Sequence, residues 1–367
     1  MISTELLIIG GGPAGLCAAI SAAGSGSRVT LLERNRALGG QLVKQTHMFF
    51  GSEKQYASTR GIDIASILLY ELKKYGDRVK IMTDTTAVGI YEDGIVTALY
   101  KEEKYLKIRP QAIIAATGAY EKPLAFPNND LPGVYGAGAV QTLMNVYGVK
   151  PGNRALMVGA GNIGLIVSYQ LMQAGVQVAA ILDAAPKIGG YLVHASKVAR
   201  MGVPILSSHT VKEAQGNTRL KRAVVCRVDS GFNPIPGTEK AFDVDTMCIA
   251  VGLSPLNELL EMRGCKMKYV PQLGGSVPVR GENYETSVDS LFVAGDTSGI
   301  EEASSAMVEG RIAGLCASAK IGRRRPDYDE LLSDYFRQLD ELRSGPAGRH
   351  IREGAAQTLI KEGEQYV

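Results

Sequence analysis

Two glycine-rich segments of this 367-residue chain have the spacing needed to hold a pyrophosphate group. The first occupies residues 10–15 (GGGPAG) and the second residues 159–164 (GAGNIG). In a G-x-G-x-x-G segment between a strand and a helix, the glycines allow a tight turn and a close approach of backbone N–H groups to phosphate. The start of the helix adds partial positive charge. The sequence therefore predicts two dinucleotide-binding sites.

An acidic residue follows each glycine-rich segment at the distance expected for a ribose contact. Glu33 lies 18 residues after Gly15, and Asp183 lies 19 residues after Gly164, each at the end of an apolar strand pattern. A carboxylate in this position accepts hydrogen bonds from the adenosine ribose. Because no pair of arginines follows Asp183 to bind a 2′-phosphate, we predict that the second site prefers NAD(H) to NADP(H).

Two further segments indicate a flavin in the first site. The glycine pair at residues 39–40, followed by Gln41, would let the backbone pass close to a large planar ligand. Near the end of the chain, Asp296 follows Gly295 and precedes a helix pattern. Its carboxylate would bind the ribityl chain of a flavin, and the helix start would face the pyrimidine ring or a phosphate. We therefore predict FAD in the first site and NAD(H) in the second.

The predicted cofactor-binding residues are these groups and their neighbours. For FAD they are Gly10, Gly12, Pro13, Ala14, Gly15, Glu33, Arg34, Gly40, Gln41, Leu42, Ala87, Thr117, Gly118, Gly295, Asp296 and Ala303. For NAD(H) they are Gly159, Gly161, Asn162, Ile163, Gly164 and Asp183. No catalytic side chain and no metal ligand is predicted, since His47 and His194 are interpreted as structural and no nucleophile–base pair is recognisable. The redox chemistry would then belong to the cofactors.

The elements that position these residues form a repeated pattern. Each half of the chain contains a strand, a helix and a second strand around its glycine-rich segment, followed later by an apolar strand that ends in glycine. These elements lie at residues 5–9, 14–23, 28–33 and 112–118, and then at 155–158, 178–183 and 247–252. The repeat predicts an α/β fold of two Rossmann-like, three-layer ββα domains, the second inserted in the first.

The predicted domain boundaries follow from this repeat. Residues 1–120 and 253–325 form the FAD-binding domain, which ends with a closing helix at 302–319, and residues 121–252 form a linker and the NAD(H)-binding domain. Prolines scattered over residues 119–152 mark the linker, and a helix at 63–75 is predicted to begin with Asp63 as its cap. Residues 326–367 form a partly helical C-terminal extension that could dock a partner.

The composition argues against several other classes of protein. A net charge of +3 is too small to indicate nucleic-acid binding, and the basic run at residues 322–326 is interpreted as a solvated helix end. None of the five cysteines belongs to a C-x-x-C pair, so no redox disulfide, iron–sulfur or zinc spacing is present. Unpaired cysteines and the lack of a long apolar run favour a cytoplasmic protein without a transmembrane segment.

Residues 1–325 resemble the glutathione-reductase and thioredoxin-reductase-like flavoproteins, although the second domain lacks the C-x-x-C pair of thioredoxin reductase. A more specific resemblance comes from residues 116–139 (ATGAYEKPLAFPNNDLPGVYGAGA) and 40–47 (GQLVKQTH). These segments resemble the alpha-type subunits of heteromeric sarcosine oxidase, hydrogen cyanide synthase and opine oxidases. The resemblance implies an FAD- and NAD-binding subunit of a hetero-oligomer, whose partner would be a separate flavin-dependent amine-oxidising subunit.

The chain also differs from this group. Many of its members carry a cysteine-rich 2Fe–2S module after the closing helix, whereas residues 326–367 contain no cysteine. A cluster, if the electron path needs one, would then belong to a separate protein. Some alpha-type subunits of the group hold a nucleotide other than FAD in the first site. The first glycine-rich segment suits any ADP moiety, and only Gly40, Gln41 and Asp296 favour flavin in particular.

Three functions are compatible with the sequence. The first is an electron-transfer flavoprotein subunit of a multi-subunit amine or amino-acid dehydrogenase or oxidase. The second is a stand-alone NADH-dependent flavin reductase of a ferredoxin-like protein or a small acceptor. The third is a subunit that holds nucleotide structurally and serves as an assembly platform. We favour the first, because the chain lacks a redox disulfide and carries the segment at residues 116–139.

Overall fold

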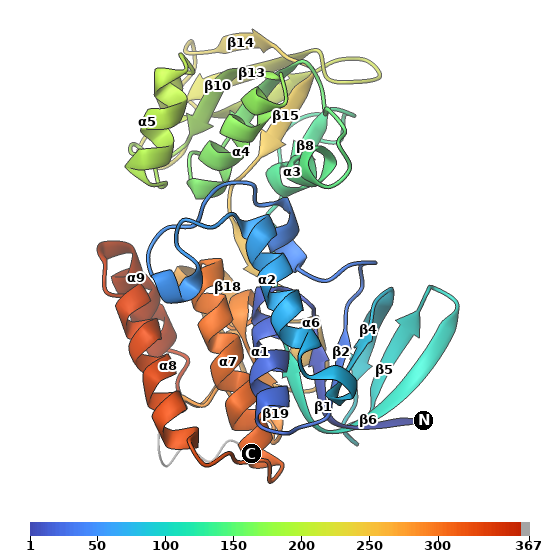
Figure 1. Ribbon diagram of the computed structural model, residues 1–367. Coiled ribbons are helices and arrows are strands. Elements are labelled where there is room, and N and C mark those ends of the chain that lie inside the picture. Colours follow the sequence, from blue (N-terminus) through green and yellow to red (C-terminus); the bar gives the residue numbers. More distant parts are fainter. Residues whose placement is uncertain (361–367) are drawn as a thin grey trace. The chain divides into compact units, whose positions relative to one another are not determined.

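The computed structural model describes residues 1–360, which divide into two compact units (Figure 1). The first unit comprises Met1–Tyr120 and the chain from Ser254 onward, and the second comprises Glu121–Leu253. The second unit is therefore inserted in the sequence of the first. The short strands β7 (Ala119–Glu121) and β16 (Leu253–Pro255) contain the two boundaries.

A mostly parallel sheet organises the first unit. Strand β1 (Ile2–Ile9) pairs with β2 (Val29–Leu32) and β6 (Lys104–Ala115), and β3 (Val79–Met82) and β19 (Leu291–Val293) extend the parallel part. The first half of β6 instead pairs antiparallel with β5 (Val96–Tyr100), which pairs with β4 (Thr85–Ile90). The carboxyl ends of β1, β2 and β6 meet at one edge of the sheet, where ligands bind in open α/β sheets.

Helices pack on one face of this sheet. They are α1 (Pro13–Gly24), α2 (Gly61–Lys73) and α7 (Ala303–Lys320). Helices α1 and α7 lie side by side (Figure 1), so close that a Cβ atom at Gly310 would lie 2.1 Å from the carbonyl oxygen of Ala14. A Cβ atom at Gly314 would lie 2.3 Å from the carbonyl oxygen of Ala18. Glycine at these positions lets the closing helix press against the start of α1.

The side chains of β1 alternate between two cores, as expected for a strand buried on both faces. Leu6 and Ile8 pack with the helices, whereas Leu7 and Ile9 pack with residues of β5, β6 and α6 (Glu258–Met262). All four side chains are at most 5% exposed. This double burial holds the end of β1, and therefore the turn that follows it, in a fixed place.

The second unit repeats this arrangement. Its parallel sheet has the order β11 (Ile205–Ser207), β10 (Gln177–Asp183), β9 (Arg154–Val158), β15 (Thr246–Ile249) and β8 (Val134–Gly136). Helices α3 (Ala137–Asn145), α4 (Asn162–Gln173) and α5 (Leu192–Arg200) belong to one core. Antiparallel strands β12 (His209–Gln215), β13 (Arg222–Arg227) and β14 (Lys240–Asp243) contribute to the other.

The C-terminal part of the described chain packs on the first unit. Helix α8 (Tyr328–Leu342) lies alongside α7, and α9 (Pro346–Ala356) follows it (Figure 1). The backbone at Arg280 then exchanges hydrogen bonds with Thr358 and Ile360, both at 3.0 Å. The remaining elements of this unit are β17 (Met267–Val270), β18 (Gly275–Pro278) and the 3₁₀ turns η1 (Gly40–Lys44), η2 (Glu53–Gln55), η3 (Gly76–Arg78), η4 (Pro271–Leu273) and η5 (Gly295–Thr297). The last seven residues of the predicted extension, 361–367, lie outside the described part.

The predicted fold class is confirmed. The chain has two Rossmann-like α/β units, the second inserted in the first, and a helical C-terminal part. None of the helices within residues 1–360 combines the length and the apolarity needed to cross a lipid bilayer.

The predicted cap of the helix at residues 63–75 is wrong. Helix α2 begins at Gly61 with Arg60 as its N-cap, and Asp63 lies in the first turn. The backbone explains the earlier start, because the carbonyl oxygens of His47 and Gln45 accept the N–H groups of Gly61 and Ile62, at 3.4 and 3.1 Å. These backbone acceptors stand in for a capping side chain.

The interpretation of residues 119–152 as a linker is also wrong in part. Strand β8 forms an edge of the second sheet, paired in parallel with β15, and α3 packs against α4. Leu124, Phe126 and Leu131 pack against the core on the other face of that sheet. The prolines mark turns between these pieces, which are integral to the second unit.

Candidate dinucleotide-binding sites

The first glycine-rich segment forms the turn from β1 to α1. Gly10 has a φ of +109°, and a Cβ atom there would lie 2.2 Å from the carbonyl oxygen of Ala116 at the end of β6. A Cβ atom at Gly15 would lie 1.8 Å from the carbonyl oxygen of Gly10. The side of Gly12 is open, since the nearest atom to a Cβ atom there is the Gly40 Cα at 3.8 Å. No side chain caps α1, so backbone N–H groups at its start can bind a phosphate.

The second glycine-rich segment repeats this geometry in the other unit. Gly159 has a φ of +111°, and a Cβ atom there would lie 2.2 Å from the carbonyl oxygen of Ala250. A Cβ atom at Gly164 would lie 2.0 Å from the carbonyl oxygen of Gly159, whereas nothing lies within 4 Å of one at Gly161. In both units the first and third glycines are needed for packing, and the second leaves open space.

The two predicted ribose-binding carboxylates lie against these turns. Glu33 accepts hydrogen bonds from the N–H of Gly11 (2.9 Å) and from the backbone and side chain of Asn35 (2.8 and 2.7 Å). Asp183 accepts them from the N–H groups of Ala160 (2.8 Å) and Ala185 (2.9 Å). A carboxylate offers about four lone-pair sites. Both acids therefore organise their own turns and retain capacity for a hydroxyl group, Asp183 more than Glu33.

A second glycine pair was missed in the sequence. Gly189 and Gly190 follow Asp183 by six and seven residues, as the pair at 39–40 follows Glu33. The N–H of Gly190 donates to the carbonyl oxygen of Ala160 at 3.0 Å, and the N–H of Gly39 donates to that of Gly11 at 2.8 Å. The repeated spacing was the signal that could have revealed it.

The turn that carries Asp296 lies against the start of α1. A Cβ atom at Gly295 would lie 2.8 Å from the Ala14 Cβ. The Thr297 hydroxyl lies 3.1 Å from that of Thr117 and accepts the N–H of Gly118 at 2.9 Å. The structure therefore brings together the first glycine-rich segment, Gly40, residues 117–118 and the Asp296 turn, which lie far apart in the sequence.

The chemistry of Asp296 fits a ligand that carries hydroxyl groups. Within residues 1–360, the hydrogen bond that its carboxyl group accepts is a long one, 3.4 Å from the N–H of Glu301. The pKa of Asp296 is raised to about 7, mainly by burial and also by the nearby carboxylates Glu309 and Glu301, against the opposing effect of that hydrogen bond. A buried carboxyl group that accepts one long hydrogen bond can still accept hydrogen bonds from the ribityl hydroxyls of a flavin.

The other residues predicted to bind a cofactor differ in their exposure and in the elements that carry them. Leu42 is fully buried in the core, so only its backbone could reach a ligand. Ala87 lies on β4 opposite Ala98 of β5. Arg34 and Gln41 are exposed. Pro13 and Ala303 are the first residues of α1 and α7. In the second unit, Asn162 accepts the N–H of Tyr191 at 2.8 Å, and the neighbouring Ile163 is 39% exposed.

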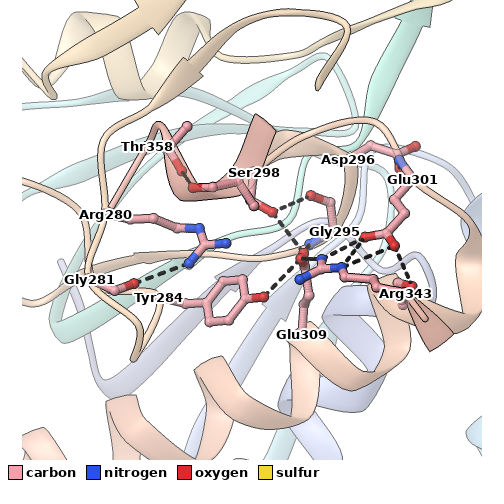
Figure 2. Close-up of polar contacts among 12 residues, drawn as sticks. Arg280, Gly281, Tyr284, Gly295, Asp296, Ser298, Glu301, Glu309, Arg343 and Thr358 are labelled. Atoms are coloured by element: carbon pink, nitrogen blue, oxygen red, sulfur yellow. Dashed lines mark hydrogen bonds and ion pairs between the residues drawn. The ribbon is translucent and has the colours of Figure 1, made fainter. Parts of the chain in front are cut away.

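A buried ionic network supports the Asp296 turn (Figure 2). Glu309 of α7 accepts hydrogen bonds from the Gly295 N–H (2.9 Å), the Ser298 hydroxyl (2.7 Å) and the Tyr284 hydroxyl (2.9 Å). Arg343, just after α8, donates to Glu309 at 2.7 Å and to Glu301 at 2.6 Å. These residues were not predicted from the sequence, because bonded partners are up to 42 positions apart and no motif links Arg343 to Glu301.

The cysteines have no features of a reactive dithiol. All five are buried and none forms a disulfide. Burial raises the pKa of the Cys17 and Cys316 thiols to about 11 and that of Cys248 to about 12. Since the thiolate is the reactive form, these side chains are inert core residues at neutral pH.

Comparison with known proteins gives consistent matches. The family model for pyridine nucleotide-disulphide oxidoreductases matches residues 4–310. The alpha chain of sarcosine oxidase from Corynebacterium sp. (strain P-1) is 26% identical over 338 residues, which are 88% of this chain and 33% of that protein. The A component of opine oxidase from Agrobacterium tumefaciens (strain Ach5) is 27% identical, with 86% of this chain and 66% of that protein covered. The HcnB component of hydrogen cyanide synthase from Pseudomonas protegens is 25% identical over 100% of this chain and 82% of that protein.

These matches confirm the resemblance predicted from residues 40–47 and 116–139. The chain spans about a third of the sarcosine oxidase relative and just under two thirds of the opine oxidase relative that it matches. Two solved structures share its fold. L-proline dehydrogenase from P. horikoshii has a TM-score of 0.70 at 24% identity, covering 91% of this chain and 59% of that one. T. acidophilum thioredoxin reductase has a TM-score of 0.72 at 21% identity, covering 87% and 99%.

Proposed function

This chain belongs to the pyridine nucleotide-disulphide oxidoreductase family, and on that premise we propose that it is the electron-transfer flavoprotein subunit of a multi-subunit amine or amino-acid dehydrogenase or oxidase. Membership of the family implies FAD binding and NAD(P) use. In the proposed complex a partner subunit oxidises a C–N bond, and the electrons pass through FAD in the first unit. NAD(H) in the second unit is proposed to exchange electrons with this FAD.

The relatives support the choice of partner chemistry. The sarcosine and opine oxidases and the proline dehydrogenase are named for substrates that contain a C–N bond, and two of the matched relatives are subunits of oxidases. This chain spans only part of those subunits, and we infer that the shared part is the dinucleotide-binding portion. We therefore place amine oxidation on a separate flavin-dependent subunit, with a further iron–sulfur protein as an optional member of a cytoplasmic hetero-oligomer.

The duplicated glycine-and-carboxylate geometry is the observation that carries this proposal. In the first unit, the start of α1 beside Gly12 would bind the pyrophosphate, Glu33 the ribose and Asp296 the ribityl chain. In the second unit, Gly161 and Asp183 would hold NAD(H) in the same way. FAD, when bound, supplies hydride acceptance and the release of electrons to the next carrier.

The inert cysteines support an electron path that does not use a disulfide. The described structure contains no disulfide, and the thiols of Cys17, Cys248 and Cys316 have raised pKa values. A chain of this family without a reactive dithiol must pass its electrons to another acceptor. A partner subunit is the acceptor, or donor, that the relatives favour.

Anaerobic titration of the purified chain with NADH tests the proposal. We expect a flavin absorbance spectrum that bleaches on addition of NADH, with little amine oxidation until partner subunits are added. Substantial turnover of a ferredoxin-like or small acceptor by the chain alone would instead favour a stand-alone reductase. Release of an adenine nucleotide other than FAD on denaturation, with no flavin, would refute the proposed electron-transfer role and favour an assembly platform.

Substitution of Asp183 tests the second site. Asp183→Ala should weaken NADH binding about tenfold, because the ribose loses a charge-assisted acceptor. The N–H groups of Ala160 and Ala185 bond to different oxygens of Asp183, so Asp183→Asn keeps an acceptor for one of them and should have a smaller effect than Asp183→Ala. Asp243→Ala is the matched control, since Asp243 is an exposed acid of the same unit paired with Arg222 at 2.7 Å. The dissociation constant from stopped-flow reduction is the measurement, and an unchanged value for Asp183→Ala would remove this residue from the site.

A further inference from the structure

The C-terminal part of the chain reaches the Asp296 turn through one arginine. Arg343 follows directly after α8 and lies outside residues 4–310, which the family model covers. Its side chain is only 9% exposed. Its Nε lies 3.1 and 3.0 Å from the two carboxylate oxygens of Glu301, and its Nη2 lies 2.6 Å from Glu301 and 2.7 Å from Glu309. Such a bidentate, buried contact fixes both carboxylates in place.

Both of these residues contact the turn that carries Asp296, Glu309 through its carboxylate and Glu301 through its backbone N–H. The second oxygen of Glu309 accepts the Gly295 N–H at 2.9 Å and the Ser298 hydroxyl at 2.7 Å, on either side of Asp296. The N–H of Glu301 donates to Asp296 itself. Figure 2 shows Arg343 below Glu301 and beside Glu309, with Gly295 and Ser298 on the far side of the Glu309 carboxylate. The guanidinium is thus connected to the turn by two short paths.

The charges around this turn require a cation. Three carboxylates, Asp296, Glu301 and Glu309, lie close enough to perturb one another. Burial raises the pKa of Glu301, whereas the hydrogen bonds from Arg343 lower it. The other charged or titratable groups nearby are Tyr284, which donates to Glu309, and Arg280, whose guanidinium stacks 3.8 Å from the centre of the Tyr284 ring. Within residues 1–360, Arg343 is therefore the cation that hydrogen-bonds Glu301 and Glu309.

Helix α8 is also tied to the segment that follows the glycine pair at 39–40. The Gln55 side chain donates to that of Gln338 at 2.5 Å, and Lys54 pairs with Asp334 at 3.2 Å. Gln55 is 4% and Gln338 is 7% exposed. Helix α8 therefore contacts the η2 segment, and Arg343 at its end contacts Glu301 and Glu309, the residues that hold the Asp296 turn.

We propose that Arg343 is a positioning residue for Asp296, so that the C-terminal extension completes the first cofactor site of the chain itself. This inference rests on the proposed function, because it takes FAD as the ligand of that site. It changes the role of the extension, which the sequence suggested only as a docking segment. Arg343 does not touch the ligand in this view. It acts by holding Glu301 and Glu309, and through them the backbone on both sides of Asp296.

The test compares Arg343→Gln with a matched control, Arg323→Gln. Arg323 donates at 2.7 Å to the buried Glu5, in the middle of β1, whose other partner is Arg28, so its loss also leaves a buried carboxylate with fewer partners. We expect Arg343→Gln to weaken FAD binding about tenfold at pH 8, as for coupled residues of one network. Arg323→Gln should lower the melting temperature of the apoprotein without changing the affinity for FAD.

A charge-balanced double variant separates positioning from folding. Adding Glu301→Gln to Arg343→Gln removes one uncompensated carboxylate and should restore part of the FAD affinity at pH 8. The measurements are apoprotein melting temperatures and flavin-fluorescence binding curves from pH 6 to 9. Wild-type affinity in Arg343→Gln, or an equal loss in Arg323→Gln, would overturn the inference alone. A wild-type chain that binds no FAD would overturn the proposed function and this inference with it.

Discussion

Gly12→Ala and Gly161→Ala should each give a well-folded protein that has lost one nucleotide. We expect purified Gly12→Ala to lack flavin, and Gly161→Ala to keep flavin that NADH no longer bleaches. Neither glycine is required by backbone conformation, since the φ and ψ angles are −77° and −171° at Gly12 and −73° and 178° at Gly161. Any L-residue adopts such extended angles.

Packing does not require these two glycines either. A Cβ atom at Gly161 would have nothing within 4 Å, and one at Gly12 would be 3.8 Å from the Gly40 Cα, an ordinary contact. Replacing glycine by alanine in a compatible conformation stabilises a protein by about 0.4–1 kcal/mol. The remaining reason for glycine is a ligand that approaches the backbone, as a pyrophosphate does. A methyl group in that path should weaken binding by about 100-fold, or roughly 3 kcal/mol.

The first and third glycines provide the contrast. At Gly15 and Gly164 a Cβ atom would lie 1.8 and 2.0 Å from a backbone carbonyl oxygen, so Gly15→Ala and Gly164→Ala should lower the melting temperature. Calorimetry of the apoproteins, flavin content and the dissociation constant for NADH separate the two classes. If Gly161→Ala binds NADH like the wild type, the second unit does not hold a pyrophosphate at this turn, and the NAD(H) assignment fails.

Local patterns explain why so much of this site could be predicted. The turn at residues 10–15 and the carboxylate of Glu33 depend on interactions within one βαβ unit, and each has a fixed spacing. The structure adds that Glu33 and Asp183 also bind the backbone of their own turns. This second role explains why an acid is useful at the strand end even before a ribose is present.

The unpredicted features depend on long-range contacts. Glu309 on α7 and Arg343 just after α8 are 34 positions apart, and neither belongs to a recognisable motif. The N-cap of α2 is Arg60 and not the predicted Asp63, because the backbone carbonyls of Gln45 and His47 accept the first N–H groups of the helix. Strand β8 was not predicted, because prolines flank it and because its partner β15 lies about 110 positions away in the sequence. None of these contacts leaves a periodic or compositional trace.

Asp296→Asn should make the apoprotein more stable at pH 8 and weaken its binding of FAD. The pKa of Asp296 is raised from 3.8 to about 7, mainly by burial. Between these values the folded chain keeps a proton that the unfolded chain has lost, so stability falls as the pH rises from about 4 to about 7 and stays lower above it. The penalty at pH 8 is on the order of 4 kcal/mol, since each pKa unit corresponds to about 1.36 kcal/mol.

An asparagine removes that penalty and keeps an acceptor for the Glu301 N–H, so the apoprotein should melt roughly 5 °C higher at pH 8 and no higher at pH 4. FAD affinity should fall about tenfold, because the ribityl hydroxyls lose a charged acceptor. Asp289→Asn is the control, since the hydrogen bond from Lys320 lowers the pKa of Asp289 and its amide should bring no gain. Stability and affinity that move in opposite directions identify a group retained for binding. An Asp296→Asn apoprotein that melts no higher than the wild type at pH 8 would show that the ionised carboxyl does not destabilise the folded protein.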